Sequence, residues 1–120
     1  MYIGIDFDGT IVKCNYPDVG KFKFLAIPTI KWLKNKGYTL ILWTCREGKY
    51  LKNALEACRS VGIEFDFINE NSPARIKQYN GDCRKLSCDF LLDDMANFVF
   101  WPFVIPRILF RQFFNKIRKR

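Results

Sequence analysis

Carboxylates and hydroxyls follow the apolar runs of this 120-residue chain, and they are the side chains that could do chemistry. They are Asp6, Asp8 and Thr10 after the first run, Thr44 after the second, and Asp93 and Asp94 after the last. Each follows residues suited to a core, so each is expected to emerge from the interior at the end of a strand. Asp-x-Asp-x-Thr alone is also typical of a solvated turn capped by its threonine. A second acidic pair after another strand, with a hydroxyl between, weakens that interpretation.

The elements that must position these side chains alternate between strand and helix. Apolar runs predict strands at residues 2–7, 39–43, 63–68 and 90–92. Helices are predicted from Pro28 to Gly37 and over residues 48–61, with Gly62 as the stop of the second. A further helical turn or two fits residues 74–79.

This alternation predicts an α/β fold: a three-layer, Rossmann-like parallel sheet with helices on both faces. Such sheets bind ligands at the carboxyl ends of their strands, near the point where the strand order reverses. The polar residues are therefore expected to converge at one edge of the sheet. The chain length fits one domain, residues 1–120.

Four carboxylates at one sheet edge would repel one another unless a divalent cation bound between them. The chain contains no histidine, so the available ligands are oxygen atoms, which Mg²⁺ prefers. We therefore expect Mg²⁺ as the cofactor.

The composition excludes several other kinds of site. Without histidine there is no Ser-His or Cys-His nucleophile pair and no mixed zinc site. The five cysteines form no CxxC pair, which favours reduced thiols. No apolar run reaches the roughly 18 residues of a membrane span, and acidic residues begin at Asp6, unlike a secretory signal. These features predict a soluble, cytoplasmic protein.

In this order and spacing, the residues resemble the motifs of the haloacid dehalogenase (HAD) superfamily of phosphohydrolases. Asp6-Phe-Asp8-Gly9-Thr10 is similar to its first motif, Leu-Trp-Thr44 to its second and Leu-Leu-Asp93-Asp94 to its fourth. The resemblance covers residues 1–95. It implies a HAD-like fold and a phosphatase, a phosphoric monoester hydrolase that works through an aspartyl-phosphate intermediate.

The resemblance also implies a role for each residue. Asp6 would be the nucleophile, and Asp8 would protonate the leaving oxygen and later deprotonate water. Mg²⁺ would be held by the Asp6 carboxylate, the Asp8 main-chain carbonyl and Asp93, with Asp94 direct or through water. Thr44 and nearby backbone amides would bind the phosphoryl oxygens.

The remaining candidates for phosphate binding are Gly9, Thr10, Arg46 and a lysine. Family members use a lysine shortly before the fourth strand, for which Lys85 has the better spacing and Lys77 is the rival. Thr10 would fix the loop. Arg46 would touch substrate, or else face solvent beside Glu47.

Many family members carry a cap domain, but here neither gap between motifs is long enough for one with its own core. The resemblance therefore implies the small, cap-less type with an open site. Open sites of this kind often act on large substrates or are closed by a neighbouring subunit.

The net charge of +8 is concentrated at the carboxyl end. The last fourteen residues carry six bases and no acid, and the rest carries fourteen bases against twelve acids. Residues 98–120, rich in aromatics, are expected to complete the core. Otherwise they would lie on a membrane surface or contact nucleic acid phosphates.

Three functions follow from these patterns. The first is hydrolysis of a small phosphorylated substrate. The second is processing of nucleic acid ends, with the basic tail holding the strand. The third is a non-catalytic binding protein with a HAD fold, against which the presence of Asp6, Asp8 and Asp93 argues.

Overall fold

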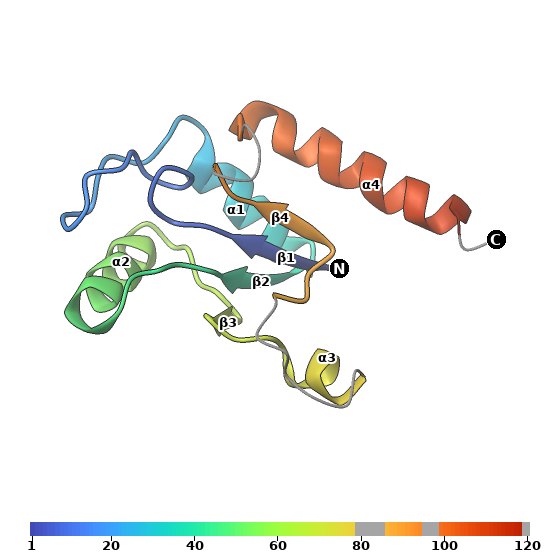
Figure 1. Ribbon diagram of the computed structural model, residues 1–120. Coiled ribbons are helices and arrows are strands. Elements are labelled where there is room, and N and C mark those ends of the chain that lie inside the picture. Colours follow the sequence, from blue (N-terminus) through green and yellow to red (C-terminus); the bar gives the residue numbers. More distant parts are fainter. Residues whose placement is uncertain (79–85, 95–98, 119–120) are drawn as a thin grey trace.

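Four short strands form the central sheet of the computed structural model, which describes residues 1–78, 86–94 and 99–118 (Figure 1). They are β1 (Tyr2–Ile5), β2 (Thr39–Leu42), β3 (Phe67–Ile68) and β4 (Phe90–Leu92). Their order is β3-β2-β1-β4, and every neighbouring pair is parallel. The register pairs Ile5 with both Leu42 and Leu92. The residues that follow β1, β2 and β4 therefore leave the sheet at the same edge.

The strand order reverses beside β1. The chain runs outward from β1 through β2 to β3, and then returns to place β4 on the other side of β1. In open parallel sheets a ligand crevice lies outside the carboxyl ends of the strands at such a reversal. Asp6 follows β1 and Asp93 follows β4, so both stand at this point.

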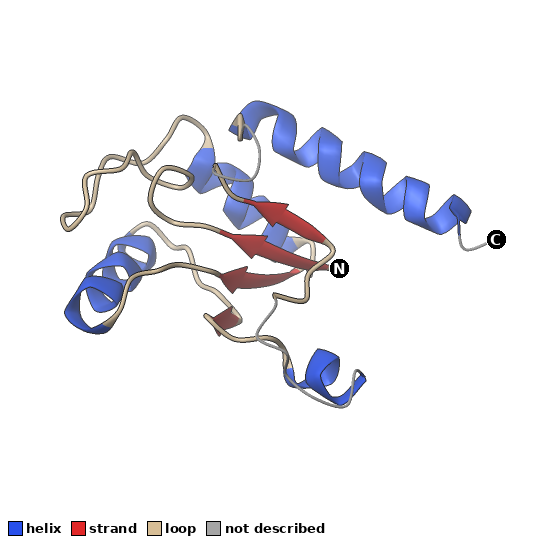
Figure 2. Cartoon of the chain, in the orientation of Figure 1, coloured by secondary structure: helices blue, strands red, loops and turns tan. Residues whose placement is uncertain are grey.

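One face of the sheet packs against three helices, and their contact forms the core. The helices are α1 (Ala26–Asn35), α2 (Gly48–Ser60) and α4 (Val104–Arg118), and α1 crosses behind the strands in Figure 2. The buried side chains of this layer come from three strands and the three helices: Ile3, Ile5, Leu40, Leu42 and Leu92 from the sheet, Ile30 and Leu33 from α1, Ala54 and Cys58 from α2, and Val104 and Ile108 from α4.

On the opposite face, residues 86–88, which lie between α3 (Pro73–Gln78) and β4, approach β1. A Cβ atom on Gly4 would lie only 2.6 Å from a side-chain carbon of Leu86, so these residues pack directly on β1. Together these layers confirm the predicted α/β class, a Rossmann-like parallel sheet flanked by helices.

Several strands and helices begin or end at other residues than the sequence predicts. The predicted strand at 63–68 is reduced to Phe67–Ile68. Ahead of it, the Asp66 carboxylate accepts the Leu40 N–H at 2.8 Å, in place of a ladder carbonyl. α1 begins at Ala26, two residues before Pro28, and α2 ends at Ser60 just before Gly62.

The carboxyl-terminal segment joins the core through a few residues only. Val99, Trp101, Val104 and Ile108 are buried, spanning the 3₁₀ turn η1 (Trp101–Phe103) and the first turns of α4. The expectation that the aromatics of this segment are buried is wrong for the phenylalanines within its described residues, because only one stripe of α4 faces the body of the protein. The exposed fractions are 61% for Phe103, 69% for Phe110 and 61% for Phe113.

Candidate active site

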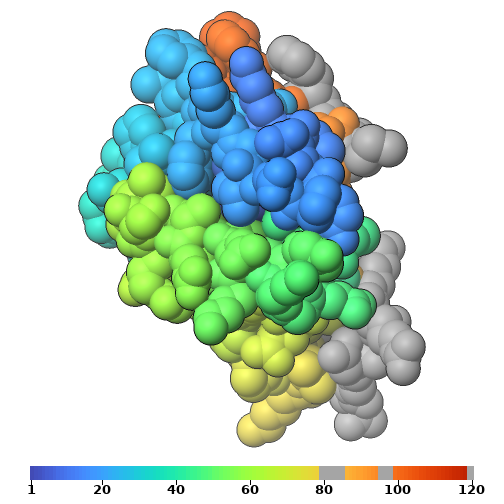
Figure 3. Space-filling view, turned by 90° about the vertical axis from the view of Figure 1, so that its left-hand side faces the viewer, coloured from blue at the N-terminus to red at the C-terminus, as the bar shows by residue number. Residues whose placement is uncertain are grey.

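Three carboxylates meet where β1 and β4 end. One ligand oxygen from each of Asp6, Asp93 and Asp94 lies within 4.8 Å of the other two. The strand pairing causes this approach, since Asp6 continues the ladder by donating its N–H to the Leu92 carbonyl at 2.8 Å. Figure 3 looks onto this side of the molecule, where the connection after β1 (blue) lies beside α2 (green).

Asp6 is the carboxylate most perturbed by this environment. The pKa of Asp6 is raised from 3.8 to about 7. Burial is the largest cause, and the negative charge of Asp93 is the next. A hydrogen bond from Thr10 opposes the rise by stabilising the charged form. A cation placed among the three carboxylates would remove the repulsion that drives part of this shift.

The turn after β1 ties Asp6 to Asp94. The fully buried Thr10 places its hydroxyl 3.0 Å from Asp6 Oδ2 and accepts the Asp94 N–H at 3.0 Å. Gly9 has φ +85°, and a Cβ there would lie 2.4 Å from Asp94 Oδ2, so only glycine fits. The Gly9 N–H donates to the Val12 carbonyl. Both residues thus make contacts within the protein, and the phosphate contacts expected from the sequence stay a prediction.

Asp8 points its carboxylate at Arg46 and not at the other three acids. Arg46 Nε donates to Asp8 Oδ2 at 2.7 Å, and Nη2 donates to Asp8 Oδ1 at 2.8 Å. This is the two-pronged geometry of a strong arginine–carboxylate pair. The hydrogen bonds to Asp8 raise the pKa of Arg46. Asp8 therefore has a fixed side-chain position beside the carboxylate cluster.

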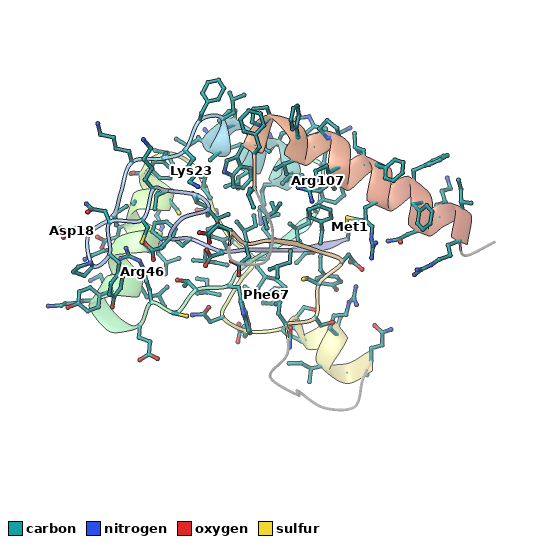
Figure 4. The ribbon with its side chains drawn as sticks, turned by 45° about the horizontal axis from the view of Figure 1, so that its top comes forward. Met1, Asp18, Lys23, Arg46, Phe67 and Arg107 are labelled. Carbon is teal, nitrogen blue, oxygen red and sulfur yellow. The ribbon has the colours of Figure 1, made fainter. Side chains whose placement is uncertain are left out.

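The rest of the Arg46 guanidinium binds backbone carbonyls on two segments. Nη1 donates to Pro17 O and Tyr50 O at 3.1 and 3.2 Å, and Nη2 donates to Asp18 O at 2.8 Å. Figure 4 shows Arg46 next to Asp18, at the end of the molecule far from Met1. Arg46 is 1% exposed, so the alternative of a solvent-facing side chain is wrong, while the substrate contact stays a prediction. It joins the loop after β1 to the start of α2.

Thr44 follows β2 and borders the same edge. Its N–H donates to Asn69 Oδ1 at 2.7 Å, and its hydroxyl oxygen accepts the Arg46 N–H at 3.2 Å. The hydroxyl hydrogen remains able to donate to a phosphoryl oxygen. Asn69 follows β3 with a φ of +53°, which is typical of an asparagine in a turn.

Of the two candidate lysines, the structure describes Lys77. Lys77 is exposed on α3, whose Arg75 pairs with Asp89 at 3.0 Å. Asp89 precedes β4 and accepts the Tyr2 N–H, so α3 is anchored at the amino-terminal edge, opposite the carboxylates. The structure does not bring Lys77 to Asp6. Lys85 lies outside the described residues.

The sequence did not predict two contacts to the turn after β1, which carries Gly9 and Thr10. The Lys23 ammonium donates to the Gly9 carbonyl, and Trp101 Nε1 donates to the Thr10 carbonyl at 2.8 Å. Both partners are backbone carbonyls, which carry no signal in a sequence. Lys23 brings a positive charge to the loop that holds the acids.

A solved structure resembles the whole chain. It is the structure of a conserved protein from Bacteroides thetaiotaomicron, 38% identical in sequence, with a TM-score of 0.80. The match covers 90% of this chain and 88% of that one. No protein-family model and no curated protein matches the chain. Identity at this level over nearly the full length of both proteins shows common descent, so the chain belongs to the family of that conserved bacterial protein.

Proposed function

We propose that the protein is a magnesium-dependent phosphomonoester hydrolase of the HAD type, with Asp6 as its nucleophile. The observation that carries the proposal is the meeting of Asp6, Asp93 and Asp94 at the strand reversal, with Asp8 fixed beside them. This adds geometry to the motif resemblance, because residues 84 or more positions apart in the chain share one site.

The chemistry begins with attack by an Asp6 oxygen on phosphorus. The bond from phosphorus to the ester oxygen breaks, Asp8 gives its proton to that oxygen, and Asp6 becomes an acyl phosphate. Asp8 then takes a proton from a water molecule, and the water oxygen attacks phosphorus. The Asp6–phosphate bond breaks, which releases inorganic phosphate and restores the carboxylate. One of the two Arg46–Asp8 hydrogen bonds has to yield during each proton transfer.

The donor set fits Mg²⁺. Asp6 and Asp93 would hold it with their carboxylates, Asp8 with its main-chain carbonyl, and Asp94 directly or through water. When bound, the ion supplies positive charge to the transferred phosphoryl oxygens. The Thr44 hydroxyl would donate to the same oxygens, and we retain Lys85 as the motif lysine.

Turnover of a small phosphomonoester, such as p-nitrophenyl phosphate, tests the proposal. We expect hydrolysis that requires Mg²⁺, stops with EDTA and disappears in Asp6→Asn. Glu56→Gln removes an exposed carboxylate from α2 and should retain activity. Persistence of hydrolysis in EDTA would remove the metal from the mechanism, and an active Asp6→Asn enzyme would remove the nucleophile.

A further inference from the structure

Helix α4 carries a second apolar stripe that the fold does not use. Val104 and Ile108 face the core, and Gln112 continues along that side with a hydrogen bond to the Tyr38 hydroxyl at 2.7 Å. Phe110, Phe113, Phe114 and Ile117 follow the i, i+3, i+4, i+7 spacing of one helix face, and each is about half exposed or more. The rings of Phe110 and Phe114 stack, with centroids 6.4 Å apart. The exposed residues therefore form a continuous aromatic surface, larger than isolated exposed side chains would give.

Cations border this surface, and acids are missing from it. At 100° per residue, Arg107, Arg111 and Arg118 lie along one side of the stripe and Lys116 along the other. The sequence contains no Asp or Glu after Asp94. Long basic side chains beside an aromatic stripe can reach outward while the rings are buried.

A groove beside the stripe has the same character. It has a volume of about 620 Å³ and is lined by Phe90, Pro106, Arg107, Phe110, Arg111 and Phe114. Arg107 lies on the side of α4 next to β4 (Figure 4), with its guanidinium 5.6 Å from the ring centroid of Phe90. The groove thus offers an apolar floor between two guanidinium groups, which suits a molecule with an acyl chain and an anionic head.

The charges beside the aromatic stripe favour one kind of binding partner over two others. A second copy of the chain would bring two cationic, acid-free helices together, so their charges would repel. Nucleic acid would satisfy the cations but leave most of a stripe of aromatic and aliphatic side chains without an apolar partner. A bilayer with anionic headgroups satisfies both, because the rings enter the headgroup–acyl boundary while the cations meet phosphates and carboxylates.

We propose that α4 binds the surface of an anionic lipid bilayer, lying in its plane with the stripe of Phe110, Phe113, Phe114 and Ile117 inserted. None of the helices in residues 1–78, 86–94 and 99–118 is long and apolar enough to span a bilayer. In Figure 1 the arrowheads of β1 and β4 point away from the carboxyl-terminal end of α4, so the residues that follow these strands leave the sheet at the opposite end.

Sedimentation of the full chain with vesicles tests this proposal. Phosphatidylcholine vesicles containing about one third phosphatidylserine should bind the protein, and pure phosphatidylcholine vesicles should bind it at least ~10-fold more weakly. Binding should weaken steeply between low and physiological salt, as expected for exposed cations meeting anionic headgroups.

Matched variants separate the stripe and the cations from general effects. Phe113→Ser should reduce binding on the order of 10-fold, whereas Phe24→Ser, which removes an exposed ring outside α4, should not. Arg111→Glu/Arg118→Glu should abolish binding, whereas the same charge change on α2 in Lys52→Glu/Arg59→Glu should leave most of it. Circular dichroism of each variant verifies that the fold is retained.

Several outcomes would overturn the proposal. Vesicles containing phosphatidylserine that fail to sediment the protein would do so, as would binding that survives both α4 variants. Binding to oligonucleotides but not to vesicles would assign the surface to nucleic acid. A dimer in light scattering that Phe113→Ser converts to a monomer would assign it to a second copy.

Discussion

Asp6 is held in a position where its charged form is disfavoured. Burial and Asp93 raise its pKa from 3.8 to about 7, which means that the folded state binds this proton more tightly than the unfolded chain does. The contribution of Asp6 to the free energy of unfolding is fully present below pH 3.8 and is lost as the pH rises through about 7. A site that destabilises its own fold at neutral pH is typical of functional carboxylates.

The raised pKa of Asp6 predicts how the thermal stability of the metal-free protein depends on pH. Asp6→Asn cannot ionise, so in EDTA it should melt at a higher temperature than the wild type above pH 7, and the difference should shrink toward pH 3.8. Thermal unfolding across this pH range measures the difference, with Glu56→Gln as control. A difference independent of pH would show that Asp6 is not the titrating group. Mg²⁺ should stabilise the wild type more than Asp6→Asn.

We expect Arg46 to act through Asp8 and not on substrate, because its buried guanidinium pairs with Asp8, and kinetics can distinguish the two roles. Arg46→Lys keeps the charge but loses the fork that holds both Asp8 oxygens. We expect kcat to fall by about 10-fold or more with little change in KM, since Asp8 is misplaced while binding is intact. Arg59→Lys, on the exposed side of α2, should be neutral.

A double-mutant cycle isolates that coupling. In an Asp8→Asn background, Arg46→Lys should have little further effect on kcat, because the group that Arg46 positions is already changed. A raised KM with unchanged kcat would instead restore Arg46 as a substrate ligand. Arg46→Ala should also lower the free energy of unfolding by about 2 kcal/mol or more, as it leaves Asp8 without its partner.

At the scale of elements, the pattern of apolar residues in the sequence predicts the strands and the edge of the sheet at which the acids meet. The apolar runs before Asp6, Thr44 and Asp93 form parallel strands, because their side chains are buried in the core. The polar residues that follow each run mark where the strand leaves the core. The convergence of Asp6, Asp93 and Asp94 follows from parallel pairing alone. These parts of the site were predictable from the sequence.

Contacts between loops were not predictable in the same way. Arg46 reads as a surface residue, but three backbone carbonyls and Asp8 satisfy its donors in the interior. Carbonyls of a loop have no residue-type signature, so no spacing rule predicts such an anchor. The same reason hid the Lys23 and Trp101 contacts to the turn.

α4 shows the other limit of periodicity. Its apolar residues occupy two stripes, and the sequence alone does not say which one the body of the protein covers. The register of Val104 and Ile108 with Trp101 decides it, because that tryptophan is fixed by its hydrogen bond to Thr10. The remaining stripe was therefore misjudged as core.

For the whole molecule, the carboxyl-terminal segment has two separable parts. Val99, Trp101, Val104 and Ile108 belong to the core, and Trp101 also supports the turn that carries Thr10. The part after Asn115 carries Lys116, Arg118 and two further bases, and none of its described residues is buried. Truncation at different points should therefore have different effects on folding and on membrane binding.

A chain ending at Asp94 should fail to fold. Burial of each large apolar side chain contributes about 1.5–3 kcal/mol, so losing four of them removes an amount comparable to the roughly 5–15 kcal/mol that stabilises a typical domain. Removing only Asn115 to Arg120 leaves all four in place, along with the Gln112–Tyr38 hydrogen bond. That shorter deletion should melt cooperatively and hydrolyse p-nitrophenyl phosphate like the full chain, while binding anionic vesicles weakly. Circular dichroism melts and the hydrolysis assay check both chains. A folded, active protein ending at Asp94 would show that the core closes without Trp101, and that α4 is an appendage along its whole length.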